Sequence, residues 1–139
     1  MDKNRGLAQV SLLVSDYDEA IDFYVNKLGF ELIEDTPLPE TSHAEQKSKR
    51  WVVITPKHSA GADLLLAEAS TDEQRATVGR QGAGRVMWFL STDDCWRDFN
   101  AFTERGVIFH ESPRTEPYGT VAVFEDLYGN LWDLLEPNK

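Results

Sequence analysis

The chain has 139 residues and a formal net charge of −10 at neutral pH. This length favours a single domain, and the 41% hydrophobic and 27% charged residues are ordinary for a globular protein. The negative charge argues against non-specific binding to nucleic acid or to anionic lipid. It does not exclude a locally basic pocket that binds an anionic small molecule.

The first five residues are polar and lack the apolar core of a signal peptide. No apolar stretch has the length that is needed to span a bilayer. The single cysteine, Cys95, cannot form an internal disulfide, which is typical of a protein in a reducing compartment. We therefore expect a cytoplasmic protein without membrane contact, in which Cys95 is a packing residue and not a nucleophile.

The first half of the sequence begins with alternating residues that predict a strand, followed by a helix. Asp16 and Glu19 form a capping box at the start of this helix, and Gly29 is suited to end it. The polar run at 37–49 has no periodicity and predicts a loop. The predicted elements are a strand at 9–14, a helix at 17–28, and strands at 30–34, 51–54 and 62–67.

Residues 69–84 separate the two halves. We predict a short helix at 72–77, followed by a segment with Gly79, Gly82 and Gly84. These glycines suggest a phosphate-binding loop, but the Walker lysine and the preceding strand are both missing. We therefore interpret the whole segment as a connector.

The second half repeats the order of elements of the first. Thr92 or Asp93 is expected to cap its helix, which carries Cys95 on its apolar face and ends at Gly106. The predicted strands are at 86–90, 107–110, 120–124 and 131–135.

The similarity of the two halves is the strongest signal in the sequence. A shift of 76 positions places Asp18 on Asp94, and a shift of 70 places Asp63 on Asp133. The repeat is too long for a solenoid unit. We predict one α+β domain over residues 1–139, with βαβββ modules at about 7–68 and 85–137. Each helix covers one face of its sheet, and the other faces form a curved mixed sheet around a pocket.

Four polar residues lie in strands that are otherwise largely apolar. Gln9 alternates with Val10, whose face is apolar, so Gln9 is expected to face the pocket. The repeat makes Arg85 its counterpart and pairs Asp63 with Asp133 on the fourth strands. This symmetric set is the main functional signal.

The segments 9–30 and 123–137 resemble the start and the end of vicinal-oxygen-chelate superfamily domains (glyoxalases, bleomycin-resistance proteins and extradiol dioxygenases). The ending that carries the resemblance is Asp126-Leu-Tyr-Gly-Asn-Leu-Trp-Asp-Leu. The resemblance implies a glyoxalase/dioxygenase-like fold with a small-molecule pocket, and a homodimer. It is less specific for the reaction, because one fold hosts many chemistries.

Metal-using members of the superfamily take ligands from the positions that match Gln9, Asp63, Arg85 and Asp133. If a divalent ion (Ni, Zn, Mn or Fe) binds, its ligands here are Gln9, Asp63 and Asp133. Arg85 has no lone pair to donate and would repel a cation. We therefore expect no metal or other cofactor, with Arg85 binding an anionic group of the ligand. Two alternatives stay open: an ion pair of Arg85 with Asp63 or Asp133, and a metal site in a shifted strand register.

Other residues are candidates for ligand contact. Ser11 lies on the face of Gln9, and Met87 is in register with the polar set. Arg114 and Tyr118 belong to a segment that is either a simple turn or a lip of the pocket. The three histidines, His43, His58 and His110, have no zinc-site spacing and are expected at the surface.

Three functions are compatible with these residues. The first is a metal-free protein that binds a small molecule. The second is a lyase, isomerase or dioxygenase that uses a metal; a metal-independent variant would use Asp133 as base and Arg85 to stabilise an oxyanion. The third is a dimerising module without a ligand.

Overall fold

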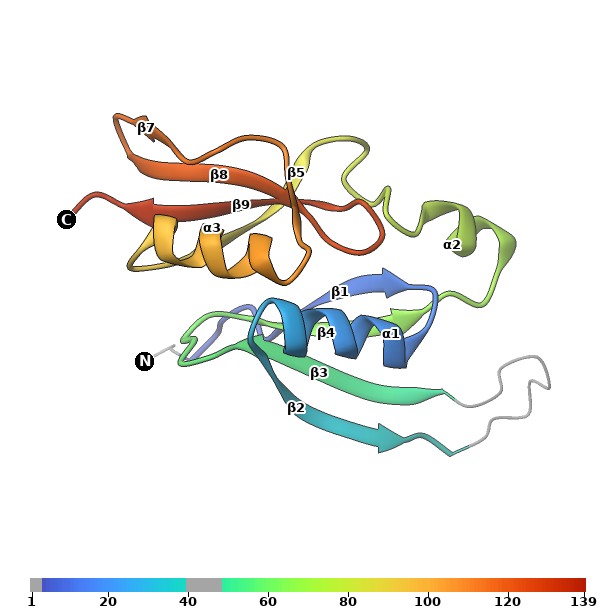
Figure 1. Cartoon of the computed structure of the whole chain (residues 1–139). Helices are drawn as coiled ribbons and strands as arrows, with labels where there is room; N and C mark the ends of the chain where they lie inside the picture. The colour runs from blue at the N-terminus through green and yellow to red at the C-terminus, as the bar shows by residue number, and fades with distance from the viewer. Residues whose placement is uncertain (1–3, 40–48) are drawn as a thin grey trace. The chain divides into compact units, whose positions relative to one another are not determined.

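The computed structural model describes residues 4–39 and 49–139, and the chain divides into two compact units, Met1–Val78 and Gly79–Lys139. Each unit contains the predicted order of one strand, one helix and further strands (Figure 1). The predicted βαβββ modules are therefore confirmed. The connector is divided between the units, because the short helix at 72–77 belongs to the first and the glycine-rich segment to the second.

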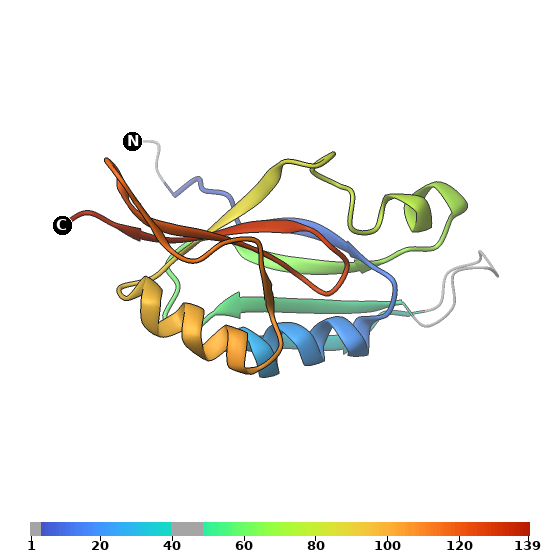
Figure 2. The same cartoon turned by 45° about the horizontal axis from the view of Figure 1, so that its top comes forward.

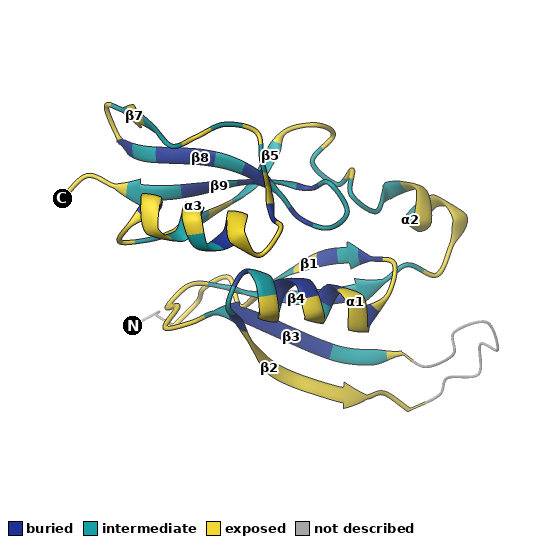
Figure 3. Cartoon of the chain, viewed as in Figure 1, coloured by how far each residue is buried: buried dark blue, intermediate teal, exposed yellow. Residues whose placement is uncertain are grey.

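The first unit is a four-stranded mixed sheet with the order β1-β4-β3-β2. Strands β1 and β4 are parallel, and the other neighbours are antiparallel. Strand β2 is longer than predicted and is exposed along all but its first residue (Figure 3). The elements are β1 (Gln9–Val14), α1 (Tyr17–Ile21), η1 (Asp22–Lys27), β2 (Phe30–Pro37), β3 (Arg50–Pro56), β4 (Asp63–Glu68) and α2 (Asp72–Thr77).

The first helix begins and ends where the sequence predicts. The side chain of Asp16 accepts a hydrogen bond from the backbone N of Asp18 at 2.8 Å, and Gly29 follows in a left-handed conformation with φ 76°. Its second part, η1, is a π-helix, which periodicity alone did not predict. Phe23 and Tyr24 of η1 are nevertheless buried, so the apolar stripe of the helix still faces the sheet.

The alternation of the strands separates a buried face from an open face, by which we mean the face that the unit's own helix does not cover. Gln9, Ser11 and Asp63 lie on the open face of the first unit, out of phase with the buried residues. On the face that the helix covers, the buried residues are all apolar: Leu12, Val14, Val52, Ile54, Leu64 and Leu66. Val53 and Thr55, on the opposite face of β3, are buried as well. The predicted assignment of the faces is thus confirmed.

The second unit is a five-stranded mixed sheet with the order β5-β9-β8-β6, and β7 pairs with β8. Helix α3 lies along one side of this sheet (Figure 1, Figure 2). Phe124 stacks on Trp132 with ring centroids 5.9 Å apart, and Phe102 of α3 meets Phe124 edge-on at 5.8 Å. The elements are β5 (Val86–Ser91), α3 (Cys95–Glu104), β6 (Ile108–Phe109), β7 (Arg114–Glu116), β8 (Gly119–Glu125) and β9 (Leu131–Pro137).

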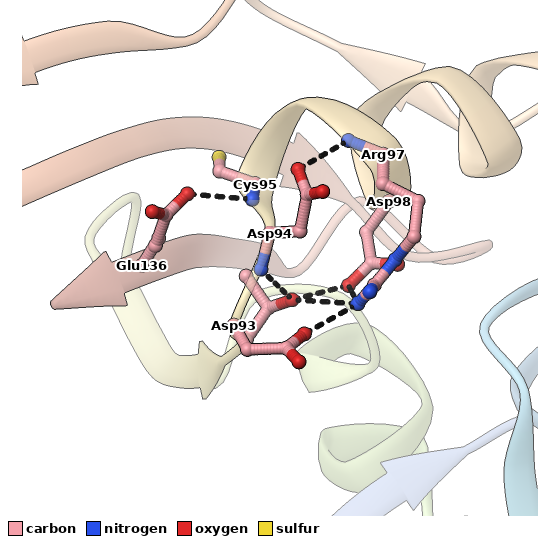
Figure 4. A network of polar contacts seen from close by, with 7 residues as sticks. Asp93, Asp94, Cys95, Arg97, Asp98 and Glu136 are labelled. Carbon is pink, nitrogen blue, oxygen red and sulfur yellow. Dashed lines mark hydrogen bonds and ion pairs between the residues drawn. The ribbon is translucent and has the colours of Figure 1, made fainter.

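Helix α3 is capped by Asp94, and the prediction of Thr92 or Asp93 as the cap is wrong. The Asp94 side chain accepts a hydrogen bond from the backbone N of Arg97 at 3.0 Å. Asp93 instead pairs with the Arg97 side chain at 2.7 Å (Figure 4). Cys95 is buried, and burial raises the pKa of its thiol to about 11. A thiol of that kind is a poor nucleophile at neutral pH, in agreement with a packing role.

The segment from Arg114 to Gly119 is a β-hairpin. Strand β7 pairs with β8 through Arg114 opposite Val121 and Glu116 opposite Gly119. The sequence was interpreted here as an irregular turn or lip, because Pro117 obscured the short strand before it. Tyr118 is exposed at the tip of this hairpin.

Equivalent residues of the two units are separated in sequence by distances that differ from the predicted shifts. The helix caps Asp16 and Asp94 are 78 positions apart. Glu68 and Glu136, which accept the N–H of the first residue of α1 and of α3, are 68 positions apart. The predicted shifts of 76 and 70 are each wrong by two residues. Asp133 therefore corresponds to Leu65 and not to Asp63.

The strand register shows the same correction directly. Gln9 lies opposite Asp63, whereas Asp133 lies opposite Phe89. Arg85 precedes β5 and is not the counterpart of Gln9 in this register. A β-bulge between Val86 and Trp88 adds a further register shift at the start of β5.

None of the helices in the described parts of the chain is long and apolar enough to cross a membrane.

Candidate functional site

A cavity of about 150 Å³ lies within the second unit. Its walls come from the glycine-rich segment, from the start of β5, from the end of β8 and from the turn before β9. At roughly 30 Å³ per water molecule, it has room for about five waters and therefore for one functional group of a ligand. The lining residues are Gly79, Gly82, Gly84, Arg85, Met87, His110, Glu125, Gly129, Asn130 and Leu131.

The turn at 126–130 forms a rigid wall of the cavity. Asp126 is only 4% exposed, and its Oδ1 accepts hydrogen bonds from the backbone N of Tyr128 and of Asn130, both at 2.9 Å. Its Oδ2 accepts a third from the Nδ2 of Asn130 at 2.8 Å. Asn130 is 3% exposed, and its Oδ1 is a buried atom without a hydrogen-bond partner. The turn thus leaves one buried acceptor unused.

The glycines of the connector bring backbone close to this turn and to β5. A Cβ on Gly79 would lie 2.0 Å from the carbonyl O of Tyr128, and one on Gly82 would lie 2.5 Å from Cγ of Met87. Side chains at these positions would displace their neighbours, so the glycines keep the cavity walls in contact. The sequence predicted them only as part of a connector, and their place at the cavity was not predicted.

Arg85 is the free cation of this cavity. Its side chain is exposed and makes no ion pair or hydrogen bond with any residue in the described part of the chain. Within the second unit, the alternative in which Arg85 pairs with Asp133 therefore has no support. Met87, also predicted as a ligand contact, lines the same cavity.

His110 and Glu125 form a hydrogen-bonded pair at the cavity wall. The Nε2 of His110 lies 2.7 Å from the Oε2 of Glu125, and both side chains are partly exposed. The prediction of a surface position for His110 is confirmed, but its place beside the cavity was not foreseen. Glu125 gives the cavity a carboxylate opposite in charge to Arg85.

Asp133 lies on the same face of β9 as Leu131, two residues further along the strand. Its Oδ1 is buried without a partner, and Phe89, opposite it on β5, is 63% exposed. Burial raises the pKa of the Asp133 carboxyl, and the nearby Arg114 charge partly offsets that effect. Asp133 does not line the cavity of Arg85, so the two residues of the hypothesised base and oxyanion pair do not share it.

Replacing Asp133 by asparagine is expected to stabilise the protein by about 1 kcal/mol at neutral pH. The folded-state pKa is raised, so ionisation of this carboxyl at neutral pH weakens the fold. As the pH falls through the folded and then the unfolded pKa, the wild-type carboxyl becomes protonated and the difference should vanish. Urea unfolding at several pH values measures this effect. Asp63→Asn, at an aspartate without a buried unpaired oxygen, should show no such gain, and an equal gain there would contradict the argument.

The guanidinium of Arg114 is bonded to two neighbouring glutamates. Its Nε donates to Glu116 at 2.7 Å, and its Nη1 pairs with Glu111. These hydrogen bonds hold the pKa of the Arg114 guanidinium above its usual range, and the one with Glu116 contributes most. Arg114 can therefore offer a ligand less of its charge than Arg85 can.

The first unit places Gln9 and Asp63 side by side on its open face. Ser11 is exposed two residues further along the strand. The buried Oγ1 of Thr55 has no hydrogen-bond partner. This face therefore carries several polar side chains, as predicted.

Neither unit alone brings together the residues that were predicted as metal ligands. Gln9 and Asp63 supply oxygen donors from two side chains, fewer than the three protein ligands of a typical catalytic site, and Asp133 belongs to the other unit. In the described ranges, no group of three or more His, Cys, Asp or Glu residues is arranged to hold an ion. We therefore derive no chemical step through a metal.

The comparisons with known proteins agree on one family. Residues 6–134 match the family described as the Glyoxalase/Bleomycin resistance protein/Dioxygenase superfamily. An uncharacterised protein of Shewanella frigidimarina is 54% identical over 96% of this chain and 95% of its own length. The protein YurT of Bacillus subtilis is 30% identical over 91% and 94%.

Solved structures show the same fold. TnmS3, an antibiotic binding protein from Streptomyces sp. CB03234, is 29% identical with a TM-score of 0.76, over 99% of this chain and 100% of that one. A glyoxalase/bleomycin resistance protein from the same organism is 31% identical with a TM-score of 0.71, over 94% and 99%.

Proposed function

The chain belongs to the Glyoxalase/Bleomycin resistance protein/Dioxygenase superfamily, and from this premise we propose that it binds a small organic molecule at the cavity of the second unit, with Arg85 holding an anionic group. The proposed binding needs no metal. The homodimer that the resemblance implies and the cytoplasmic location expected from the single cysteine stay predictions.

The observation that carries the proposal is the unpaired guanidinium of Arg85 at a cavity whose lining also includes Asn130, a residue with a buried, unused acceptor. A guanidinium offers five N–H donors in a planar fork that matches a carboxylate. The protein supplies no carboxylate to Arg85 from the described residues. A ligand carboxylate would fill that place and form charge-assisted hydrogen bonds.

The size of the cavity adds a second constraint. At about 150 Å³ it is smaller than the roughly 300–1,000 Å³ of pockets that enclose a whole drug-sized ligand. The anionic group would therefore enter the cavity, while the rest of the molecule lies along the open face of the sheet towards Phe89. The similarity to an antibiotic binding protein of known structure supports a small organic molecule as the ligand.

The test is a titration of the protein with 3-phenylpropionate, an aromatic carboxylate, followed by ¹H–¹⁵N NMR. We expect Arg85→Gln to weaken binding at least about 10-fold, because the charge-assisted hydrogen bonds that are lost contribute about 1.5–3 kcal/mol. Signals of the cavity residues, such as Gly129, should move in the wild type. Binding should survive exhaustive treatment with a chelator.

Arg80→Gln is the matched control, because Arg80 is an exposed arginine of the same segment and does not line the cavity. This variant should bind as the wild type does. If the Arg85→Gln and wild-type proteins bind 3-phenylpropionate with equal affinity, the proposal is wrong. If treatment with the chelator abolishes binding, the metal-dependent alternative is favoured instead.

A further inference from the structure

The side chain of Asn130 has a fixed orientation that leaves its oxygen unused. Both oxygens of the Asp126 carboxylate are acceptors, so the group that faces Oδ2 at 2.8 Å must be the Nδ2 donor of Asn130. The amide therefore cannot be flipped without setting two acceptors against each other. Its Oδ1 remains as a buried acceptor on a residue that lines the cavity. A hydrogen-bond donor of the ligand would satisfy it.

The charges of the cavity favour a positive donor. Arg85 contributes one positive charge and Glu125 one negative charge, and His110 is already engaged with Glu125 at 2.7 Å. An anion bound to Arg85 would neutralise the charge of that arginine. The negative charge of Glu125 would then have no positive counterpart from Arg85 at the cavity wall. A cationic N–H group on the ligand would complement Glu125 and donate to Oδ1 of Asn130 at the same time.

The cavity holds about as much as five water molecules, so the two ligand charges must be close together. An ammonium and a carboxylate on one carbon atom meet this condition. We propose that the cavity binds an α-ammonio carboxylate, the head group of an amino acid. Its carboxylate lies on Arg85, and its ammonium lies on Asn130 and Glu125. This inference rests on the proposed function, because it adds the ammonium to the anion already assigned to Arg85.

The experiment compares three probes that share a phenyl ring: L-phenylalanine with both charges, 3-phenylpropionate with the carboxylate, and 2-phenylethylamine with the ammonium. Each is titrated into the ¹⁵N-labelled protein, and the side-chain NH₂ signals of Asn130 report on its own carbonyl oxygen. We expect phenylalanine to bind at least about 10-fold more tightly than either of the other probes. The Asn130 signals should move with phenylalanine and much less with 3-phenylpropionate.

Glu125→Gln tests the ammonium arm without disturbing the buried turn. It should reduce the preference for phenylalanine over 3-phenylpropionate to less than about 3-fold, because the ammonium loses its carboxylate partner while the ligand carboxylate keeps Arg85. Glu104→Gln, at an exposed glutamate at the end of α3, is the control and should preserve the preference.

The two ways of failing can be told apart. Equal, Arg85-dependent binding of phenylalanine and 3-phenylpropionate would overturn the amino-acid head group and keep the anion site. Binding of 2-phenylethylamine as tightly as phenylalanine, unchanged by Arg85→Gln, would overturn the anion site itself.

Discussion

Replacing Asp126 by alanine is expected to lower the free energy of unfolding by about 3–5 kcal/mol. The carboxylate is 4% exposed and accepts hydrogen bonds from two backbone N–H groups and from the Asn130 side chain. Alanine would leave those buried donors without partners, and each unpaired donor costs about 1–3 kcal/mol. Urea-induced unfolding, followed by tryptophan fluorescence, measures the loss.

Two further variants separate the causes of this effect. Asp126→Asn keeps the shape of the side chain, and one of its oxygens can still accept, so the loss should be smaller, about 1–2 kcal/mol. Asp72→Ala removes an aspartate that pairs with Arg75 on the exposed helix α2, and it should change stability by less than about 0.5 kcal/mol. A loss below 1 kcal/mol for Asp126→Ala would mean that the turn does not depend on this carboxylate.

The same variant connects the turn to binding. Asp126 holds the Asn130 amide through Nδ2, so its loss would also free the acceptor that we assign to the ligand. Any Asp126→Ala protein that remains folded should therefore bind phenylalanine no more tightly than it binds 3-phenylpropionate.

The fold could be predicted because each signal was local. The capping residue Asp16 and the stop at Gly29 define the first helix, and the alternation from Gln9 to Val14 identifies the face of β1 that is buried. These features depend on the neighbouring residues in sequence. The βαβββ order then followed from their repetition.

The register between the halves could not be predicted in the same way. A slip of two residues keeps every side chain on its own face, because the side chains of a strand alternate with period two. The hydrophobic pattern is therefore insensitive to it, although it moves a residue about 7 Å along the strand. This is why Asp133 was matched with Asp63 between the two halves, when the structure matches it with Leu65. The bulge before Trp88 also has no sequence signal beyond its effect on pairing.

The candidate site was predicted only in part, for a related reason. Arg85 was singled out as the repeat counterpart of Gln9, a relation that the strand register does not support, but it does line the cavity, as does Met87. Asn130 was interpreted as a turn residue, which it is. Its burial to 3% exposure depends on the packing of the glycine-rich segment against the turn. A tertiary contact of that kind leaves no periodicity in the sequence, so the acceptor and Glu125 beside it were missed.

Replacing Gly119 by alanine is expected to cost at least about 3 kcal/mol or to prevent folding of the second unit. A Cβ at this position would lie 2.2 Å from the carbonyl O of Glu136 and 3.1 Å from Cα of Pro137. Both atoms are backbone of β9, so relief requires β8 and β9 to separate where Gly119 pairs with Pro137. The φ of 151° adds strain for a residue with a Cβ.

Gly84→Ala distinguishes the clash from the strain. Gly84 has a φ of 89°, but nothing lies within 4 Å of the added Cβ. Its replacement should therefore cost only the backbone strain, about 1–2 kcal/mol. Thermal and urea unfolding of the two variants give the comparison. If both lose the same stability, the close approach of β8 to β9 is not what requires a glycine, and positive φ alone explains residue 119. If only Gly119→Ala fails to fold, the hairpin of β8 and β9 that supports both Glu125 and Leu131 is fixed by that single contact.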